Sequence, residues 1–175
     1  MKLARLVVLS AAALLLASSG FARAETKVVL SDTHICCPAC VRDAGAILKG
    51  IEGVTGKCDQ KAKSITITAK DDATVQKAID ALAAGGFHGK TDSKDVTVKD
   101  DSGVKKGQVK TLTITGVHNC CGACTSALKN TLKKVEGVKG DTVVNKMTTF
   151  DVTGEFDAEA VIKALNAAGF HAKVK

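Results

Sequence analysis

The cysteines and histidines of this chain fall into two short motifs of identical type. One motif reads His-x-Cys-Cys-x-x-Cys from His34 to Cys40, and the other has the same pattern from His118 to Cys124. Thiolates and imidazoles bind soft and borderline cations such as Cu(I), Zn(II), Cd(II) and Hg(II) in preference to Mg²⁺ or Ca²⁺. A Cys-x-x-Cys turn holds two sulfurs on the same side of a loop, within reach of one ion. The spacing therefore predicts a soft-metal site in each half of the chain, with one ion per domain.

The predicted ligands form two matched sets. They are Cys37, Cys40, Cys36, His34 and His88 in the first half, and Cys121, Cys124, Cys120, His118 and His171 in the second. The Cys-x-x-Cys pairs form the core of each set. For the first cysteine of each motif, Cys36 or Cys120, it stays open whether the side chain is a ligand, since adjacent cysteines point in different directions. The histidines are either ligands or structural and partly exposed residues. Cys58 has no counterpart and is predicted to be a small buried apolar side chain.

The two motifs belong to an internal repeat of the chain. The motifs are offset by 84 residues, and Gly86-Phe87-His88 matches Gly169-Phe170-His171 at an offset of 83. All four histidines and six of the seven cysteines thus occur as registered pairs. Chance does not explain such a pattern, so each half is predicted to be one folding unit.

Each half is predicted to fold as strand, helix, strand, strand, helix, strand. The expected strands lie at 27–30, 54–60, 64–69, 109–115, 138–145 and 148–153, with a short last strand closing each unit. Apolar side chains at helical spacing follow each motif and recur in a second helix of each half. Thr74 and Asp157 are the expected N-caps of the second helices, which Gly86 and Gly169 end. The fold class is therefore α+β, with two tandem ferredoxin-like βαββαβ sandwiches.

The domain boundaries follow from composition. Residues 1–24 are predicted to be a signal peptide, 25–91 the first domain, 92–108 a polar linker and 109–175 the second domain. The linker is rich in Asp, Ser, Lys and Gly, and its Val96–Val98 run could add a short strand.

The first 24 residues have the features of a secretory signal. Lys2 and Arg5 precede an apolar run from Leu6 to Ala17, and Ala22-Arg23-Ala24 is an A-x-A cleavage site. The run is shorter than the ~20 residues that a membrane-spanning helix needs. We expect a periplasmic or secreted protein with no stable membrane insertion after cleavage.

Composition argues against nucleic-acid binding. The formal net charge is +7, and three of the basic residues lie in the signal segment. The chain has no Trp or Tyr and five Phe, so aromatic platforms for stacking bases are few. Lysines are spread along the chain, as on an ordinary solvated surface.

The layout resembles the heavy-metal-associated domain of copper chaperones, copper-pumping ATPases and periplasmic mercury-binding proteins. The resemblance covers residues 27–91 and 109–175 and depends on the Cys-x-x-Cys motif after the first strand, and on the Gly-Val and Gly-Phe pairs that follow it. It implies that Cys37 and Cys40, with Cys121 and Cys124, are metal ligands, and it favours Cu(I) as the ion. It also implies a carrier or chaperone that exchanges the ion with a partner.

The chain departs from that family next to the first ligand. The family usually has Gly-Met-x there, whereas this chain has His34-Ile35-Cys36 and His118-Asn119-Cys120. The added nitrogen and third sulfur favour three- or four-coordinate binding of Zn(II), Cd(II) or Cu(I) over a two-coordinate site. Lys57 and Asp141 replace the apolar residues that the family tends to have, which predicts a bulged or less buried second strand.

The leading functional prediction is a non-enzymatic, exported carrier, chaperone or scavenger of a soft metal. Its expected partners are the metal ion and a membrane metal transporter or exported metalloprotein. The alternative is a thiol–disulfide redox protein that uses the same Cys-x-x-Cys pairs, because such pairs at a helix start also serve redox enzymes.

Overall fold

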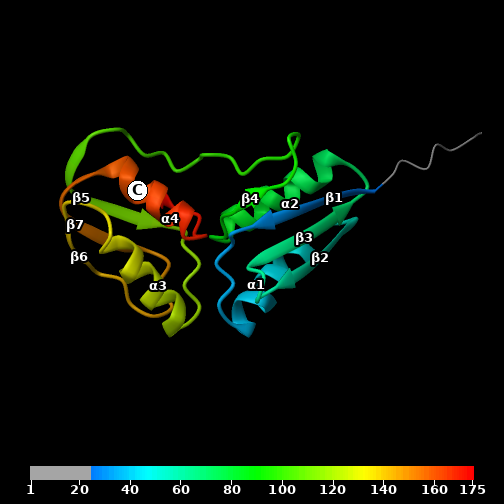
Figure 1. The fold of residues 1–175 in the computed structure, drawn as a ribbon, viewed down its shortest axis with the longest axis horizontal. Coiled ribbons are helices and arrows are strands. Elements are labelled where there is room, and N and C mark those ends of the chain that lie inside the picture. Colours follow the sequence, from blue (N-terminus) through cyan, green and yellow to red (C-terminus); the bar gives the residue numbers. More distant parts are fainter. Residues whose placement is uncertain (1–24) are drawn as a thin grey trace, which may run out of the picture.

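The computed structural model describes residues 25–175 (Figure 1). The predicted signal peptide, residues 1–24, lies outside the described residues. Two α+β domains lie side by side, each with the element order predicted from the sequence. The first contains β1 (Thr26–Ser31), α1 (Pro38–Lys49), β2 (Val54–Asp59), β3 (Ser64–Ala69), α2 (Asp72–Ala84) and β4 (Lys90–Thr91). The second contains β5 (Gln108–Thr115), α3 (Gly122–Leu132), β6 (Val138–Asp141), β7 (Phe150–Asp157), α4 (Ala158–Ala167) and β8 (Lys173–Val174).

Each domain has a four-stranded antiparallel sheet. The strand orders are β2-β3-β1-β4 and β6-β7-β5-β8, so the first strand of each domain is central and the short last strand is its outer neighbour. Ser31 at the end of β1 pairs with Lys90, and Thr115 at the end of β5 pairs with Lys173. These pairings confirm the α+β class with two ferredoxin-like sandwiches. They also place the start of each last strand beside the point where the metal motif begins.

The two helices of each domain pack on one face of its sheet. Alternate residues of β1 and β3 are buried, as the period of two in a half-buried strand requires. The first core is built from Val28, Leu30, Ile65, Ile67, Ala44, Leu48, Ile79 and Leu82, and the second from Ile114, Phe150, Val152, Leu128, Leu132, Val161 and Leu165. This burial fixes the helix that follows each motif against its own sheet.

The helix caps were predicted correctly in one of two places. Asp157 is the N-cap of α4, and its side chain accepts a hydrogen bond from the Ala160 backbone N–H. The prediction of Thr74 as the N-cap of α2 was wrong, because the helix begins earlier at Asp72. Asp71 caps it and accepts from the backbone N–H of Thr74 at 2.8 Å. Either residue type can cap a helix, and the extended backbone of Asp71 determines which one does.

The second strand differs between the two domains. β2 pairs regularly with β3, whereas the pairing of β6 with β7 shifts register between Val138 and Gly140. The predicted bulge is therefore present in the second domain, and β6 ends at Asp141 rather than near residue 145. In β2 the residue Lys57 is exposed. Cys58 is half-buried opposite Ile65 and packs against the edge of the core.

Residues 92–107 connect the domains along one side of the molecule (green in Figure 1). Val96 and Ser102 are buried, while most of the segment is exposed. The Gln76 side chain of α2 hydrogen-bonds both the carbonyl and the N–H of Thr97, at 2.8 and 3.0 Å. Val96–Val98 does not form the short strand considered from the sequence. The segment therefore follows α2 before it reaches the second domain.

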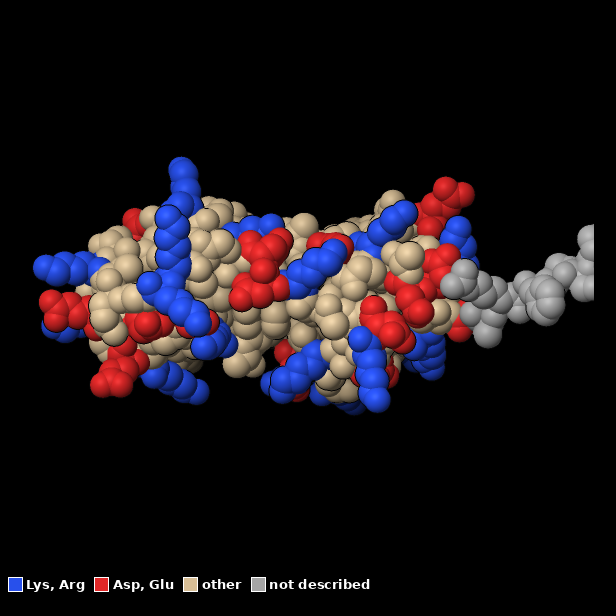
Figure 2. Space-filling view, turned by 90° about the horizontal axis from the view of Figure 1, so that it is seen from above, with Lys and Arg blue, Asp and Glu red and all other residues tan. Residues whose placement is uncertain are grey.

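Positive and negative side chains are interspersed on the face that Figure 2 shows. Among the described residues, Lys99 pairs with Asp80 at 2.6 Å and Lys173 with Asp101 at 2.6 Å. Within residues 25–175, every helix is too short or too polar to cross a membrane.

Candidate metal centre

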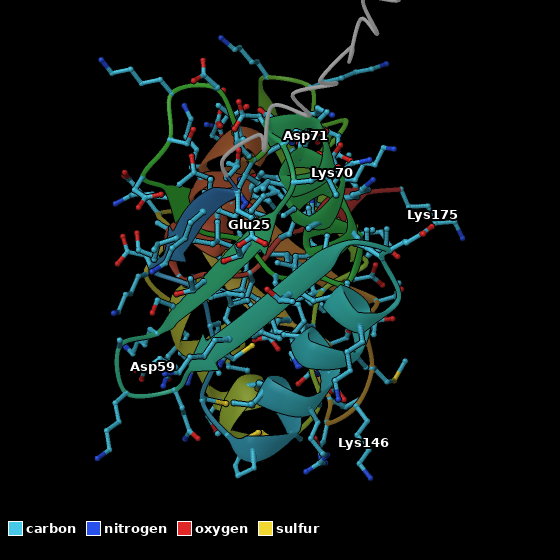
Figure 3. All side chains as sticks on the ribbon, turned by 90° about the vertical axis from the view of Figure 1, so that its right-hand side faces the viewer. Glu25, Asp59, Lys70, Asp71, Lys146 and Lys175 are labelled. Atoms are coloured by element: carbon cyan, nitrogen blue, oxygen red, sulfur yellow. The ribbon has the colours of Figure 1, made fainter. Side chains whose placement is uncertain are left out.

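The two predicted metal motifs meet at the junction between the domains. β1 and β5 both end there, and the loops that follow, residues 32–37 and 116–121, run next to each other in Figure 1. Figure 3 looks along the molecule with the first domain in front. Sulfur atoms lie near α1 and α3, at the end opposite Lys70 and Asp71. The repeat therefore builds one shared cluster of cysteines.

The sulfur atoms of the six motif cysteines are in contact. Within each Cys-x-x-Cys pair the two sulfurs are 3.5 Å apart in the first motif and 3.6 Å apart in the second. Across the junction Cys36 Sγ lies 3.4 Å from Cys124 Sγ, and Cys40 Sγ lies 3.5 Å from Cys120 Sγ. All seven cysteines of the described chain are free thiols. The contacts between domains are thus as short as those within each motif.

Local structure explains how each motif presents its sulfurs. Cys37 and Cys121 are the N-cap residues of α1 and α3, with extended backbones. Pro38 occupies the first turn of α1, where a backbone N–H is not needed. Cys40 and Cys124 lie one turn into the helices, and both are fully buried. The sulfurs therefore gather around the two helix N-termini, where the backbone dipoles favour negative charge.

Each motif histidine is held by the other domain. The His34 ring stacks on Phe170 with ring centroids 4.1 Å apart, and the His118 ring stacks on Phe87 at 4.2 Å. Burial lowers the pKa of His34, which favours the neutral imidazole that a metal requires. These cross-domain contacts orient both imidazoles at the junction.

The Nε2 atoms of His34 and His118 are buried and have no hydrogen-bond partner among the described residues. The carboxylate of Asp43 is 3.9 Å from His118 Nε2, too far for a hydrogen bond. Buried polar atoms are nearly always paired, because an unpaired one costs roughly 1–3 kcal/mol. Each of these two histidines also has a ring nitrogen within 4.8 Å of sulfurs of the cluster, which points to a ligand that is an electron-pair acceptor.

Three groups of side chains could each hold an ion, and all three draw on both domains. They are Cys40, His118, Cys120 and Cys124; His34, Cys36 and Cys124; and Cys36, Cys37 and Cys121. Within each group the ligand atoms lie within 4.8 Å of one another. The groups overlap, since Cys124 belongs to the first and second and Cys36 to the second and third. The structure thus brings together eight of the ten predicted ligands.

Negative charge is concentrated on a few sulfurs of the cluster. The contact between Cys40 Sγ and Cys124 Sγ lowers the pKa of Cys40 and raises the pKa of Cys124. Burial raises the pKa of Cys36 to about 12. A hydrogen bond from the Cys124 backbone N–H lowers the pKa of Cys121 to about 7. An incoming cation must therefore displace protons from several thiols, which makes its affinity rise with pH.

The remaining predicted ligands, His88 and His171, lie against each other. Their Nδ1 atoms are 3.2 Å apart, and His171 Nε2 lies 2.7 Å from a carboxylate oxygen of Asp101. Neither belongs to the three ligand groups with the cysteines. An N–H at His171 Nε2 donates to Asp101, which leaves its Nδ1 to accept a hydrogen bond from His88. This pair therefore joins the domains at a place separate from the sulfurs.

Gly86 and Gly169 allow the two domains to approach each other. Each follows its helix in a left-handed conformation, with φ of +84° and +85°, in a Schellman turn. A side chain at Gly86 would collide with the His118 backbone, and one at Gly169 with the His34 backbone. The next residues, Phe87 and Phe170, form an antiparallel bridge between the domains. Both glycines were predicted only as helix ends, so their role at the junction was missed.

Two further contributors were not found from the sequence. Asn119 is buried, and its amide donates to the carbonyls of Val144 and Met147 at 2.8 and 2.9 Å. It braces the second motif on the β6–β7 loop, whereas Ile35 fills the matching place in the first domain with apolar volume. Asp101 lies in the connecting segment, outside the repeat, so no internal match could reveal its contact with His171.

Two pockets lie beside the cysteine cluster, one at each motif. One of about 400 Å³ is lined by residues 32–36, Lys63, Ala167 and Ala168. The other, of about 560 Å³, is lined by residues 116–120, Lys146, Thr148, Asp43, Ala84 and Gly85. Each pocket reaches the histidine and first cysteine of one motif and a helix end of the other domain. They give a small ion or a ligand-bearing partner two routes to the sulfurs.

Comparison with known proteins finds similarity among solved structures. No protein-family profile matches the chain. No curated protein sequence matches it either. Among solved structures, it is similar to the solution structure of the N-terminal soluble domains of Bacillus subtilis CopA. The two share 19% sequence identity over 87% of this chain and 95% of that one, with a TM-score of 0.30. The case for metal binding therefore comes from the side chains of this chain.

Proposed function

We propose that this protein is a carrier or scavenger of a soft metal ion, which it binds in the cysteine cluster shared by its two domains. The observation that carries the proposal is the pair of buried, unpartnered imidazole nitrogens beside six free thiols. A metal ion satisfies both kinds of donor at once, because it accepts electron pairs from nitrogen and from sulfur.

The sulfur separations favour three or four ligands over two. With metal–sulfur bonds of about 2.3 Å, two sulfurs lie about 3.8 Å apart at a tetrahedral ion, about 4.0 Å at a trigonal one and about 4.6 Å at a linear one. The contacts of 3.4–3.8 Å in the cluster are closest to the tetrahedral and trigonal values. Cu(I) is the favoured cargo by resemblance to heavy-metal-associated domains, and Zn(II), Cd(II) and Hg(II) share its preference for thiolates.

The proposed setting is outside the cytoplasm, after removal of residues 1–24. There the protein would deliver its ion to, or collect it from, a membrane metal transporter or an exported metalloprotein. The two pockets support such an exchange, because one is lined by Cys36 and the other by Cys120, so a partner's ligand can approach either sulfur. The role needs no turnover chemistry, so we propose that the protein is not an enzyme.

The test is metal binding by the reduced mature chain and by a Cys37→Ser/Cys40→Ser variant. Native mass spectrometry with Cu(I), Zn(II) or Hg(II) should show tight binding, and X-ray absorption should show a sulfur-rich shell containing nitrogen. In a shared site the double variant binds its remaining metal more weakly, because Cys40 lies in one ligand group with His118, Cys120 and Cys124 of the second domain. Loss of half of the metal, with unchanged affinity for the other half, would indicate one independent site per domain.

A Cys58→Ser variant is the matched control, since Cys58 lies on β2 outside the cluster. It should bind as much metal as the unaltered chain. Absence of tight binding to any of the three ions, with rapid reduction of a disulfide substrate instead, would favour the thiol–disulfide alternative and refute the metal carrier.

A further inference from the structure

The three ligand groups of the cluster are connected through common sulfurs. Cys124 Sγ lies with Cys40, Cys120 and His118 on one side and with Cys36 and His34 on the other. Cys36 Sγ lies 3.8 Å from Cys121 Sγ and 3.4 Å from Cys124 Sγ, so it stands between the second and third groups. A thiolate has several lone pairs and can bind two soft ions at once. The overlap is therefore the arrangement of bridging ligands.

We propose that the junction holds a polynuclear Cu(I)–thiolate cluster of three ions, in which Cys124 and Cys36 bridge neighbouring ions. The proposal rests on the function proposed above and replaces the expectation of one ion per domain. One ion lies among Cys40, His118, Cys120 and Cys124, and the next is bound by His34 and the two bridging sulfurs. The last ion is bound by Cys36, Cys37 and Cys121. Each thiol that binds releases its proton, and copper and sulfur keep their oxidation states.

Charge compensation favours several ions over one. If all six thiolates of the cluster are ionised, one Cu(I) leaves five negative charges within contact of each other, whereas three leave three. Repulsion between charges about 4 Å apart is several kcal/mol in a partly buried site. Lys63 lines one of the two neighbouring pockets and Lys146 the other, and their positive charges offset part of the remaining negative charge.

The arrangement also predicts how the cluster fills. Because bridging sulfurs are shared, the first ion fixes ligands for the second, so binding is cooperative. Both domains must be docked for any of the three groups to form, since each group takes residues from each domain. The tertiary structure thus converts two short motifs into one binding unit.

The test uses the reduced mature chain and Cu(I) alone, added stepwise without oxygen. Native mass spectrometry should show the free chain and the three-copper form together, with little of the one- and two-copper forms. X-ray absorption of the unaltered protein should show a short metal–metal scattering shell. A single ion per chain, or two ions without that shell, would overturn the cluster while leaving metal binding intact. Absence of tight Cu(I) binding would refute the proposed function itself.

Cys36→Ser and Cys120→Ser are matched variants that test the bridging role. The two cysteines hold equivalent places in the repeat and are both half-buried, but Cys36 belongs to two ligand groups and Cys120 to one. Cys36→Ser should drop to one copper and lose the metal–metal shell, while Cys120→Ser keeps the shell. Equal loss in both variants would overturn the assignment of Cys36 as a bridge. Circular dichroism of each metal-free variant checks that it folds.

Discussion

Asn119 and Ile35 occupy the same place in the two motifs but support them by different means. Ile35 is buried and packs in the first core, whereas the Asn119 side chain makes three hydrogen bonds with the β6–β7 loop and Thr125. A buried amide is stable only when its polar atoms are paired. The second motif therefore depends on polar contacts that the first does not have.

We expect Asn119→Ala to lower the free energy of unfolding by about 2 kcal/mol, because the Met147 carbonyl loses the amide donor and the Val144 carbonyl keeps only the backbone N–H of Met147. Urea denaturation of the metal-free protein measures this change. Thr125→Ala removes only one of the three hydrogen bonds and should cost less than Asn119→Ala. A cost under about 0.5 kcal/mol for Asn119→Ala would show that water replaces the amide.

At the scale of elements, the segment after the second helix of each domain builds the junction. In each domain the glycine of the Gly-Phe-His sequence ends the helix, and the buried phenylalanine ring stacks on the motif histidine of the other domain. The histidine of the sequence contacts the equivalent histidine of the other domain, as His88 does with His171. The backbone N–H of His88 donates to Gly169, and that of His171 donates to Gly86. One short segment thus ends the helix, fills part of the core and forms the contact between the domains.

Gly86→Ala should separate the domains and weaken metal binding by more than tenfold. A methyl group at this position meets the His118 backbone, in addition to the cost of a left-handed conformation. Gly53→Ala is the matched control, because Gly53 has a similar φ of +73° and open space around it. It should cost about 1–2 kcal/mol in stability and leave affinity unchanged. Chelator competition reports affinity, and equal loss in both variants would contradict the junction role.

Acidification should loosen the junction between pH 6.5 and about 4. Burial and the neighbouring His171 lower the pKa of His88 to about 4, while Asp100 opposes this shift. In that window the separated or unfolded chain binds a proton that the docked chain does not, so stability falls as the pH falls. Asp101 and Lys173 complete the charged groups around the pair.

The pH dependence of unfolding by urea measures this effect, with the metal-free protein compared with His88→Gln. The variant should have a flatter profile over the same window, because glutamine cannot take up the proton. Identical slopes for the two proteins would show that His88 does not control docking.

At the scale of the whole molecule, the connecting segment keeps the two motifs at a high local concentration. Residues 92–107 follow α2 and reach the second domain near Asp101, so both halves of the cluster stay on one chain. An intramolecular site of this kind depends on chain connectivity as well as on its ligands.

Doubling the length of this segment with a Gly/Ser insert between Lys105 and Lys106 should weaken copper affinity only about threefold, since loop closure then costs about 0.6 kcal/mol more. Cutting the chain at the same exposed place should make binding depend on protein concentration. Competition with a chelator at two protein concentrations distinguishes the cases. A loss above a hundredfold for the insert would mean that the segment itself orients the domains.

The sequence by itself determined the folding units and predicted eight of the side chains that the structure brings together at the junction. The period of apolar residues, the two motifs and the registered Gly-Phe-His segments predict two βαββαβ domains, because strands, helices and caps depend on neighbouring residues. The local sequence pattern also predicted that the cysteines lie at the start of α1 and α3.

Only the tertiary structure decided that the two motifs make one centre. Docking depends on which surfaces fit, such as Gly86 against His118 and Phe170 against His34, and no periodicity along the chain records such a contact. It also divided the histidines, with His34 and His118 beside the sulfurs and His88 paired to His171. A repeat shows what is duplicated, but the position of one copy against the other follows from packing between their surfaces.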